Sequence, residues 1–166
     1  MRSPEYCTIE RQHQGRVLEF AAFRWPLSGF GAADWPTEPG GVLRDAAHRP
    51  LLLHFSPGRW LAPAPTPAME SLFDATARAG RGSSIDVTGK WQQVLVAGPG
   101  AGRLLACALD IAAVLEGRGC AAAVLFDCPA VLAQSAVGFE LWVQASYEVD
   151  FLATAGRFAA ELGRKA

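Results

Sequence analysis

Short apolar runs separated by proline and glycine constrain this chain more than any other feature. Residues 16–24 (RVLEFAAFR) alternate as expected for a strand, and residues 50–55 (PLLLHF) are apolar enough for a buried strand. The turn residues of 56–58 (SPG) then lead into a short strand through Trp60, which predicts a hairpin. Runs of this length favour β-strands over long helices.

The second part of the sequence continues this pattern. Residues 83–89 and 91–98 predict a second hairpin that turns at Gly89. The apolar stretch 120–134 (CAAAVLFDCPAVLAQ) predicts two strands broken at Pro129. In the following run GFELWVQ, Trp142 lies opposite the apolar face of Phe139, Leu141 and Val143, so this strand is expected to bury both faces.

Two segments carry helix signals. Thr66 and Pro67 form a good helix start, Met69, Leu72 and Phe73 then share one face, and Gly80 is a plausible stop. Ser146 is expected to cap a final helix with one apolar side, lined by Val149, Leu152, Ala159 and Leu162. The order of elements predicts an α+β fold of mostly antiparallel strands with helices on one face. We expect one compact domain over 1–166, or two small, intimately packed halves, 1–80 and 81–166.

Composition excludes several classes of partner. Half of the 166 residues are hydrophobic (51%), so the chain can bury a core, and 15 basic residues balance 16 acidic ones. A balanced chain has no global field for nucleic acid or anionic lipid, so neither is an expected partner. The amino terminus has no apolar stretch of signal-peptide length, and no segment is long enough to span a membrane. The expected location is therefore cytoplasmic.

The stretch VLVAGPGAGRLLACALDI, residues 94–111, resembles a phosphate-binding loop between a strand and a helix. Gly98 and Gly100 fit the first two glycines of a dinucleotide fingerprint, but Arg103 stands where the third belongs. No Gly-Lys-Ser/Thr follows, and Pro99 removes an amide donor from the loop. A turn that needs positive φ is the favoured interpretation. Periodicity then predicts one helix from Gly102 to Glu116.

Other residues with potential chemistry show no recognised catalytic or metal-ligand spacing. The scattered cysteines (Cys7, Cys107, Cys120, Cys128) and histidines (His13, His48, His54) predict no metal site. Asp86 and Asp127 lie in or beside apolar strands, where each either has a raised pKa or, the favoured interpretation, holds a turn through backbone amides. The tryptophans are numerous enough to supply core, a partner-binding surface or both: Trp25, Trp35, Trp60, Trp91 and Trp142.

Taken in order, five motifs resemble the gamma subunit of heterotetrameric sarcosine oxidase over about residues 16–160. They are DWPTEPGG, LLLHFSPGRWLAPAP, IDVTGKWQQVLVAGPGAGRLLACALDI, GRGCAAAVLFDCPAVLAQ and GFELWVQASYEVDFLATA. The family positions map onto Pro36, Glu38, Pro39, Trp60, Asp86, Gly98, Pro99, Asp110 and Cys120. We expect these residues to have structural roles.

The resemblance implies a fold like the folate-binding domain of glycine-cleavage aminomethyltransferases. It also implies an accessory chain without catalytic residues, whose partners are the large flavoprotein subunits of an amine oxidase. FAD, FMN, NAD and folate would then belong to the larger subunits, and zinc to the small delta subunit. The alternatives are a free-standing domain that binds folate or a similar flat heterocycle between tryptophans, and self-association of the isolated chain.

The sequence also departs from the family. The region between residue 24 and residue 34 is short, so the first helix of the family fold is expected to be reduced or lost. The resemblance further implies that the helix after the glycine turn ends near Cys107 and continues as a loop, and we favour this over the longer helix that periodicity indicates. Such departures leave room for a divergent member that serves another oxidase, or none.

Overall fold

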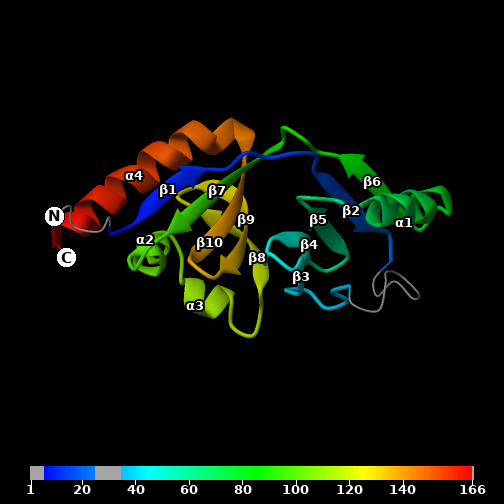
Figure 1. Ribbon diagram of the computed structural model, residues 1–166, viewed down its shortest axis with the longest axis horizontal. Coiled ribbons are helices and arrows are strands. Elements are labelled where there is room, and N and C mark those ends of the chain that lie inside the picture. The colour runs from blue at the N-terminus through cyan, green and yellow to red at the C-terminus, as the bar shows by residue number, and fades with distance from the viewer. Residues whose placement is uncertain (1–5, 25–34, 166) are drawn as a thin grey trace. The chain divides into compact units, whose positions relative to one another are not determined.

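The computed structural model describes residues 6–24 and 35–165, and its chain divides into two compact units that are interleaved in sequence (Figure 1). The first unit holds residues 1–13, 89–116 and 122–166, and the second holds 14–88 and 117–121. The described elements form two antiparallel five-stranded sheets and four α-helices, which confirms the predicted α+β class. The single compact domain that the sequence suggests stays a prediction.

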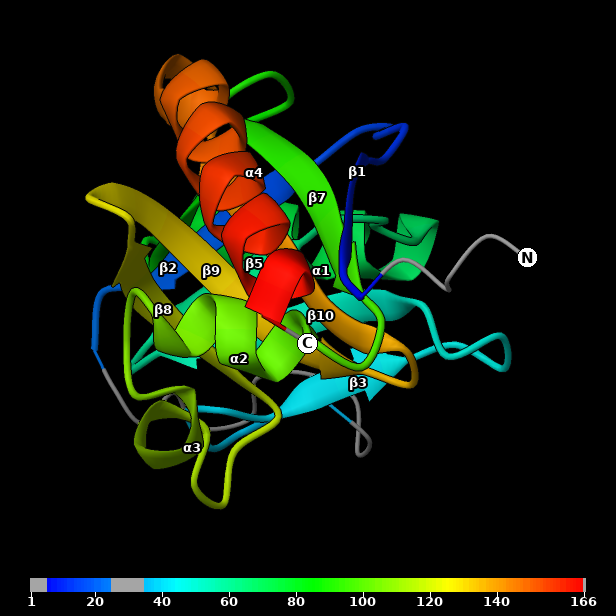
Figure 2. The same ribbon diagram turned by 90° about the vertical axis from the view of Figure 1, so that its left-hand side faces the viewer.

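The first sheet has the strand order β1-β7-β10-β9-β8. Its strands are β1 (Thr8–Arg11), β7 (Trp91–Ala97), β10 (Gly138–Gln144), β9 (Cys128–Ser135) and β8 (Cys120–Leu125). The accompanying helices are α2 (Ala101–Ala106), α3 (Ile111–Val114) and α4 (Glu148–Lys165), with a 3-10 turn, η1 (Ala145–Tyr147), before α4. Figure 2 looks onto α4 and α2, which lie in front of the strands of this unit. The fully buried Leu141 pairs with Val94 and Leu132, so one apolar layer runs across the central strands.

The second sheet has the order β3-β4-β5-β2-β6. Its strands are β3 (Val42–Arg44), β4 (Pro50–Ser56), β5 (Arg59–Ala62), β2 (Leu18–Ala22) and β6 (Gly82–Asp86), and its helix is α1 (Pro67–Arg78). The core of this unit is aromatic. Phe20 stacks on Phe73 of α1 with ring centroids 4.8 Å apart, and the centroid of the Trp60 ring lies 5.7 Å from that of Phe20.

Several sequence predictions are confirmed. The strands expected at 16–24 and 50–55 are β2 and β4, and β4 pairs antiparallel with β5 as the predicted hairpin. Helix α1 begins where Thr66 accepts a hydrogen bond from the amide of Met69 at 3.3 Å. Leu141, Trp142 and Val143 are all fully buried, so β10 buries both faces.

The hairpin predicted around Gly89 is wrong. Gly89 does adopt a positive φ of 87°, but β6 and β7 belong to different sheets. The physical reason is that β7 pairs with β1 on one side and with β10 on the other, so neither edge is left for β6. Strand β6 pairs with β2 instead.

The break predicted at Pro129 is displaced. The chain turns at Phe126 and Asp127, whose φ angles are 50° and 65°, while Pro129 lies inside β9. Two consecutive residues with positive φ make the turn that matches the twist of a two-residue hairpin. Turn geometry therefore decides the boundary, and proline does not.

The final helix differs from the prediction in its start and its buried side. Ser146 lies within η1, and α4 begins at Glu148. Its buried residues are Glu148, Phe151 and Ala155, whereas Val149 is 77% exposed. The Glu148 carboxylate forms an ion pair with Arg11 of β1, and this contact turns α4 toward β1.

The long helix suggested by periodicity is also wrong. Helix α2 ends at Ala106, next to Cys107, as the family resemblance implies, and a separate short helix, α3, follows at Ile111 where a loop was expected. Asp110 begins α3 because its carboxylate accepts the amide of Ala113 at 3.1 Å. The resemblance predicts that the first helix of the family is reduced or lost between residues 24 and 34. This prediction and Trp25 fall on residues 25–34, which lie outside the described residues. None of the described helices is long and apolar enough to cross a membrane.

Candidate functional site

The glycine turn uses its amide groups within the protein. The amide of Gly98 donates to the carbonyl of Val137 at 3.2 Å, and that of Gly100 donates to the carbonyl of Tyr6 at 2.8 Å. The amide of Ala101 donates to Gly98 itself, and Pro99 has no amide hydrogen. A phosphate cradle needs several free amides that converge on one point. These contacts therefore favour the turn over a nucleotide site.

Contacts with Tyr6 explain why Gly100 and Arg103 occupy their positions in this turn. Its ring lies where a side chain on Gly100 would project, so that position accepts only glycine without rearrangement. Arg103, which replaces the third glycine of a dinucleotide fingerprint, donates to the Tyr6 hydroxyl at 3.3 Å. The turn is therefore packed by the segment before β1, which lies far from it in sequence.

We expect Gly98→Ala to destabilise the protein by about 1–2 kcal/mol. Gly98 has φ +99°, and an added Cβ would lie 3.1 Å from the Tyr6 carbonyl oxygen. Gly80→Ala is the matched comparison, because Gly80 also has positive φ (68°) but open space around it. Urea unfolding should show the larger loss for Gly98→Ala, and equal stability of that variant and the wild type would contradict the assignment. Binding of phosphate compounds should not change.

Residues of the DWPTEPGG motif, from Pro36 to Gly41, contact the buried His54 and Trp60 of the second unit. The Trp60 indole donates to the Pro36 carbonyl at 3.1 Å and stacks on His54 with centroids 4.2 Å apart. The backbone of His54 is bonded to Gly40 (2.6 Å) and Gly41 (3.0 Å). Residues 36–41 form a loop, called the motif loop below, in which the Glu38 carbonyl accepts the amide of Gly41 at 3.1 Å. The contacts with His54 and Trp60 attach this loop to the hairpin β4–β5.

Burial lowers the pKa of His54 to about 4, although backbone groups of Glu38, Pro36 and Ser56 oppose the shift. The ring is fully buried, and its Nε2 atom accepts the amide of Gly58 at 3.2 Å. A histidine in this position is neutral at neutral pH and does not contact solvent. It therefore supports the hairpin and is a poor candidate for an acid or base.

The lowered pKa of His54 predicts a specific pH dependence of stability. The unfolded state, with an ordinary histidine pKa of about 6.5, binds the proton more readily than the folded state, so stability falls as pH decreases from about 6.5 to 4. The shift corresponds to about 3 kcal/mol. Unfolding in urea at several pH values should give a shallower fall for His54→Gln and an unchanged fall for the exposed His13→Gln. Identical slopes for both variants would contradict this role.

Asp86 holds a turn, as the favoured interpretation proposed. Its carboxylate accepts the amide of Thr88 at 3.0 Å and the guanidinium of Arg16 at 3.0 Å. The Thr88 side chain and amide, followed by Arg16, lower the Asp86 pKa to about 2. The Thr88 hydroxyl also accepts the amide of Val17 at 2.9 Å. The raised-pKa alternative is therefore wrong for Asp86. Asp127 is exposed in the β8–β9 turn.

The cysteines have no partner for metal or redox chemistry among the described residues. All four are free, and no group of three potential ligands gathers in residues 6–24 and 35–165. Burial raises the pKa of the Cys120 thiol to about 12. The Cys120 sulfur lies 3.4 Å from the Gly41 carbonyl, so this family position also contacts the motif loop.

The tryptophans that the structure describes are buried and do not gather on a surface. Trp60 and Trp142 are fully buried, and Trp35 and Trp91 are at most 9% exposed. The fifth, Trp25, lies outside the described residues. The described part of the chain therefore gives no support to a tryptophan-lined heterocycle pocket or to a tryptophan-bearing docking face, and both stay predictions. The four described indoles are core side chains.

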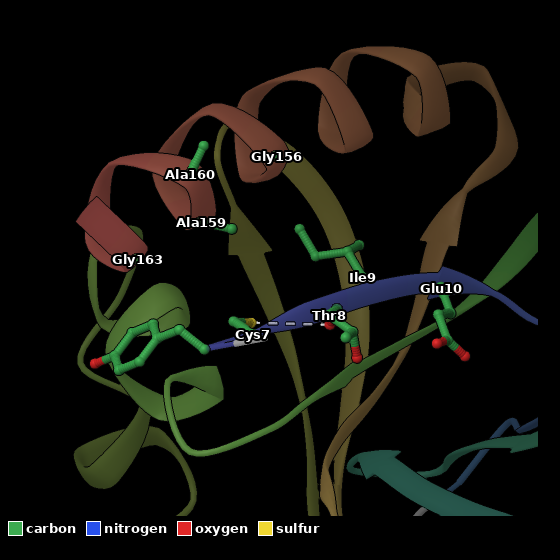
Figure 3. Close-up of a pocket in the computed structure, with 9 residues that line it drawn as sticks. Cys7, Thr8, Ile9, Glu10, Gly156, Ala159, Ala160 and Gly163 are labelled. Carbon is green, nitrogen blue, oxygen red and sulfur yellow. Dashed lines mark hydrogen bonds between the residues drawn. The ribbon is translucent and has the colours of Figure 1, made fainter. Parts of the chain in front are cut away.

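A groove of about 470 Å³ lies between β1 and α4 (Figure 3). One wall is the segment Tyr6–Glu10, and the other is the small-residue face of α4, which consists of Gly156, Ala159, Ala160 and Gly163. In Figure 3, Ile9 points toward α4, whereas Thr8 and Glu10 point away from it. A second hollow of about 460 Å³ in the same unit lies beside Phe126 and Phe158, whose rings stack at 5.4 Å.

Sequence reasoning missed this groove. No element was expected before residue 16, because TIER contains a single apolar residue and shows no alternation of apolar positions. A signal did exist in α4, where Gly156, Ala160 and Gly163 recur at helical spacing and predict one smooth face. Only the fold shows that β1 lies along it.

No protein-family model matches the sequence, and no curated protein matches it. Among solved structures, the fold is similar to a chain of the heterotetrameric sarcosine oxidase from Corynebacterium sp. U-96, determined in complex with pyrrole 2-carboxylate. The match has a TM-score of 0.75 at 16% sequence identity and covers 97% of this chain and 88% of that chain. A likeness at this identity establishes the fold and leaves function to be argued separately.

Proposed function

We propose that this chain is a non-catalytic accessory subunit, of the gamma type, in a flavin-dependent complex that oxidises sarcosine or a related N-methyl amino acid. The observation that carries the proposal is the structural match, which spans nearly the full length of both chains. A full-length match means that the matched chain is close to this one in size. The likeness is thus to a whole small chain of a heterotetrameric enzyme and not to one domain of a large chain.

The contacts of the candidate residues support a structural role. His54 is enclosed in the core of the second unit, Asp86 holds a turn, and Cys120 carries a thiol whose pKa is raised to about 12. Pro36 and Trp60 bind each other directly. In the proposed complex the large flavoprotein subunits hold FAD, FMN, NAD and folate, the small delta subunit holds zinc, and this chain stabilises the assembly.

Affinity capture from cells that encode the chain tests the proposal. A tagged copy should co-purify with a flavoprotein, and the captured complex should show flavin absorbance and produce peroxide when sarcosine is added. The isolated chain, purified in parallel as the control, should show neither. Peroxide production by the isolated chain, or capture of no flavoprotein, would contradict the accessory role. Micromolar binding of tetrahydrofolate to the isolated chain in calorimetry would instead support the free-standing folate-binding domain.

A further inference from the structure

Strand β1 is an edge strand, and no described strand pairs with its outer side. The amide of Gln12 donates to Gln93 of β7 at 2.9 Å, in register with the pairs from Thr8–Ala97 to Arg11–Val94. In an antiparallel pair, alternate residues direct their main-chain groups to the same side. Cys7, Ile9 and Arg11 therefore direct theirs away from β7. Such an edge is a template for one more strand.

The neighbouring face of α4 leaves room that none of the residues in 6–24 and 35–165 fills. Glycine weakens a helix interior relative to alanine, yet Gly156 and Gly163 both lie on this face. An added Cβ on Gly156 would meet nothing within 4 Å, and one on Gly163 would meet only Tyr6 at 3.8 Å. Packing among the described residues therefore does not require either glycine. A second helix could approach α4 closely here.

The contacts at the two ends of the groove define its direction. Arg11 binds Glu148 at the start of α4, and Tyr6 lies beside Gly163 near its end, so α4 runs antiparallel to β1. The first turn of α4 is acidic (Glu148, Asp150), and the last turn is basic (Arg164, Lys165). Two such helices packed antiparallel would bring opposite charges together at both ends.

We infer that the groove is an interface between two copies of this chain, in which β1 pairs antiparallel with β1 of the second copy across a two-fold axis. The register that fits places Ile9 opposite Ile9 of the second copy and Thr8 opposite Glu10. A shift by two residues toward the end of β1 would place Glu10 opposite Glu10, and like charges directly opposite each other destabilise a sheet. The β1-containing sheets of the two copies then form one continuous sheet. The two α4 helices pack on the same face of it, with Asp150 beside Arg164 of the second copy.

The isologous geometry is self-consistent because one operation satisfies the strands and the helices together. A two-fold axis through Ile9 makes the β1 strands antiparallel and thereby makes the α4 helices antiparallel as well. The inference concerns the chain by itself and does not rest on the proposed accessory function.

Light scattering coupled to size exclusion tests the interface over a range of concentrations. The wild-type chain should show a dimer of about twice 17.6 kDa that dissociates on dilution. Ile9→Pro should raise the dimer dissociation constant at least about tenfold above that of Ile9→Ala, because proline removes the outward amide and leaves the β7 ladder intact. The alanine variant is the matched control, since it also loses the isoleucine side chain.

Charge reversal provides a second test that does not depend on the fold of the proline variant. Asp150→Lys should weaken the dimer about threefold to tenfold at low salt, and the double variant Asp150→Lys with Arg164→Asp should restore it. A wild-type chain that stays monomeric at all concentrations would overturn the inference. A dimer that none of these substitutions weakens would also overturn it, because the two copies would then associate through another surface.

Discussion

Gly138→Ala should destabilise the protein by about 4 kcal/mol. Gly138 opens β10, a central strand that pairs with Ala97 of β7 and Ser135 of β9. Its φ is +154°, and an added Cβ would lie 3.0 Å from the Cα of Ala97 and closer still to the carbonyl oxygen of Val96. Both atoms are backbone, so the neighbouring strand would have to move.

Gly102→Ala is the control for this substitution. Gly102 lies in α2, and an added Cβ there would meet nothing within 4 Å. We expect Gly102→Ala to be neutral or to stabilise the protein by up to about 1 kcal/mol, because alanine favours helix. Denaturant unfolding should therefore give free energies of unfolding that change in opposite directions for the two variants, or that differ by several kcal/mol. Similar stabilities would show that β10 begins in another conformation.

Trp60→Ala should cost about 3–5 kcal/mol of unfolding free energy. The side chain is fully buried, contacts the rings of Phe20 and His54, and donates a hydrogen bond to the Pro36 carbonyl. Truncation removes the largest apolar surface in the core of the second unit and leaves that carbonyl without its indole donor. Thermal and urea unfolding should both report the loss.

Trp60→Phe separates the two contributions. Phenylalanine keeps most of the apolar volume and cannot donate to Pro36, so we expect an intermediate loss of about 1–2 kcal/mol. If Trp60→Phe were as damaging as Trp60→Ala, the hydrogen bond to the motif loop would dominate. If Trp60→Ala were tolerated, the aromatic cluster would not be the core of this unit.

Local signals in the sequence predicted local structure well. The hairpin from residue 50 to residue 62, the capped start of α1 at Thr66 and the turn at Gly98 each depend on residues within a few positions of one another. The family resemblance placed the end of α2 near Cys107, where periodicity over a short apolar run had predicted a longer helix. The role of Asp86 also followed from its neighbours, because Thr88 is two residues away.

Features that depend on distant partners were predicted poorly. Strand β1 has almost no apolar pattern of its own and forms because the edge of β7 is open to it. The β1–α4 groove, which is the candidate interaction site, was missed for the same reason. The tryptophans could not be assigned to surface or core from the sequence, since an indole suits both environments.

The sequence by itself determined the α+β class, the approximate positions of most strands and the absence of a standard phosphate-binding pattern at Gly98 to Gly102. Only the tertiary structure decided that β6 and β7 join different sheets, that α4 buries Glu148, Phe151 and Ala155, and that Tyr6 packs against the glycine turn. The physical reason is the sequence separation over which the interactions act. Strand propensity, capping and turn chemistry act over a few residues, whereas strand pairing and helix rotation depend on contacts such as Arg11–Glu148, which are more than a hundred residues apart.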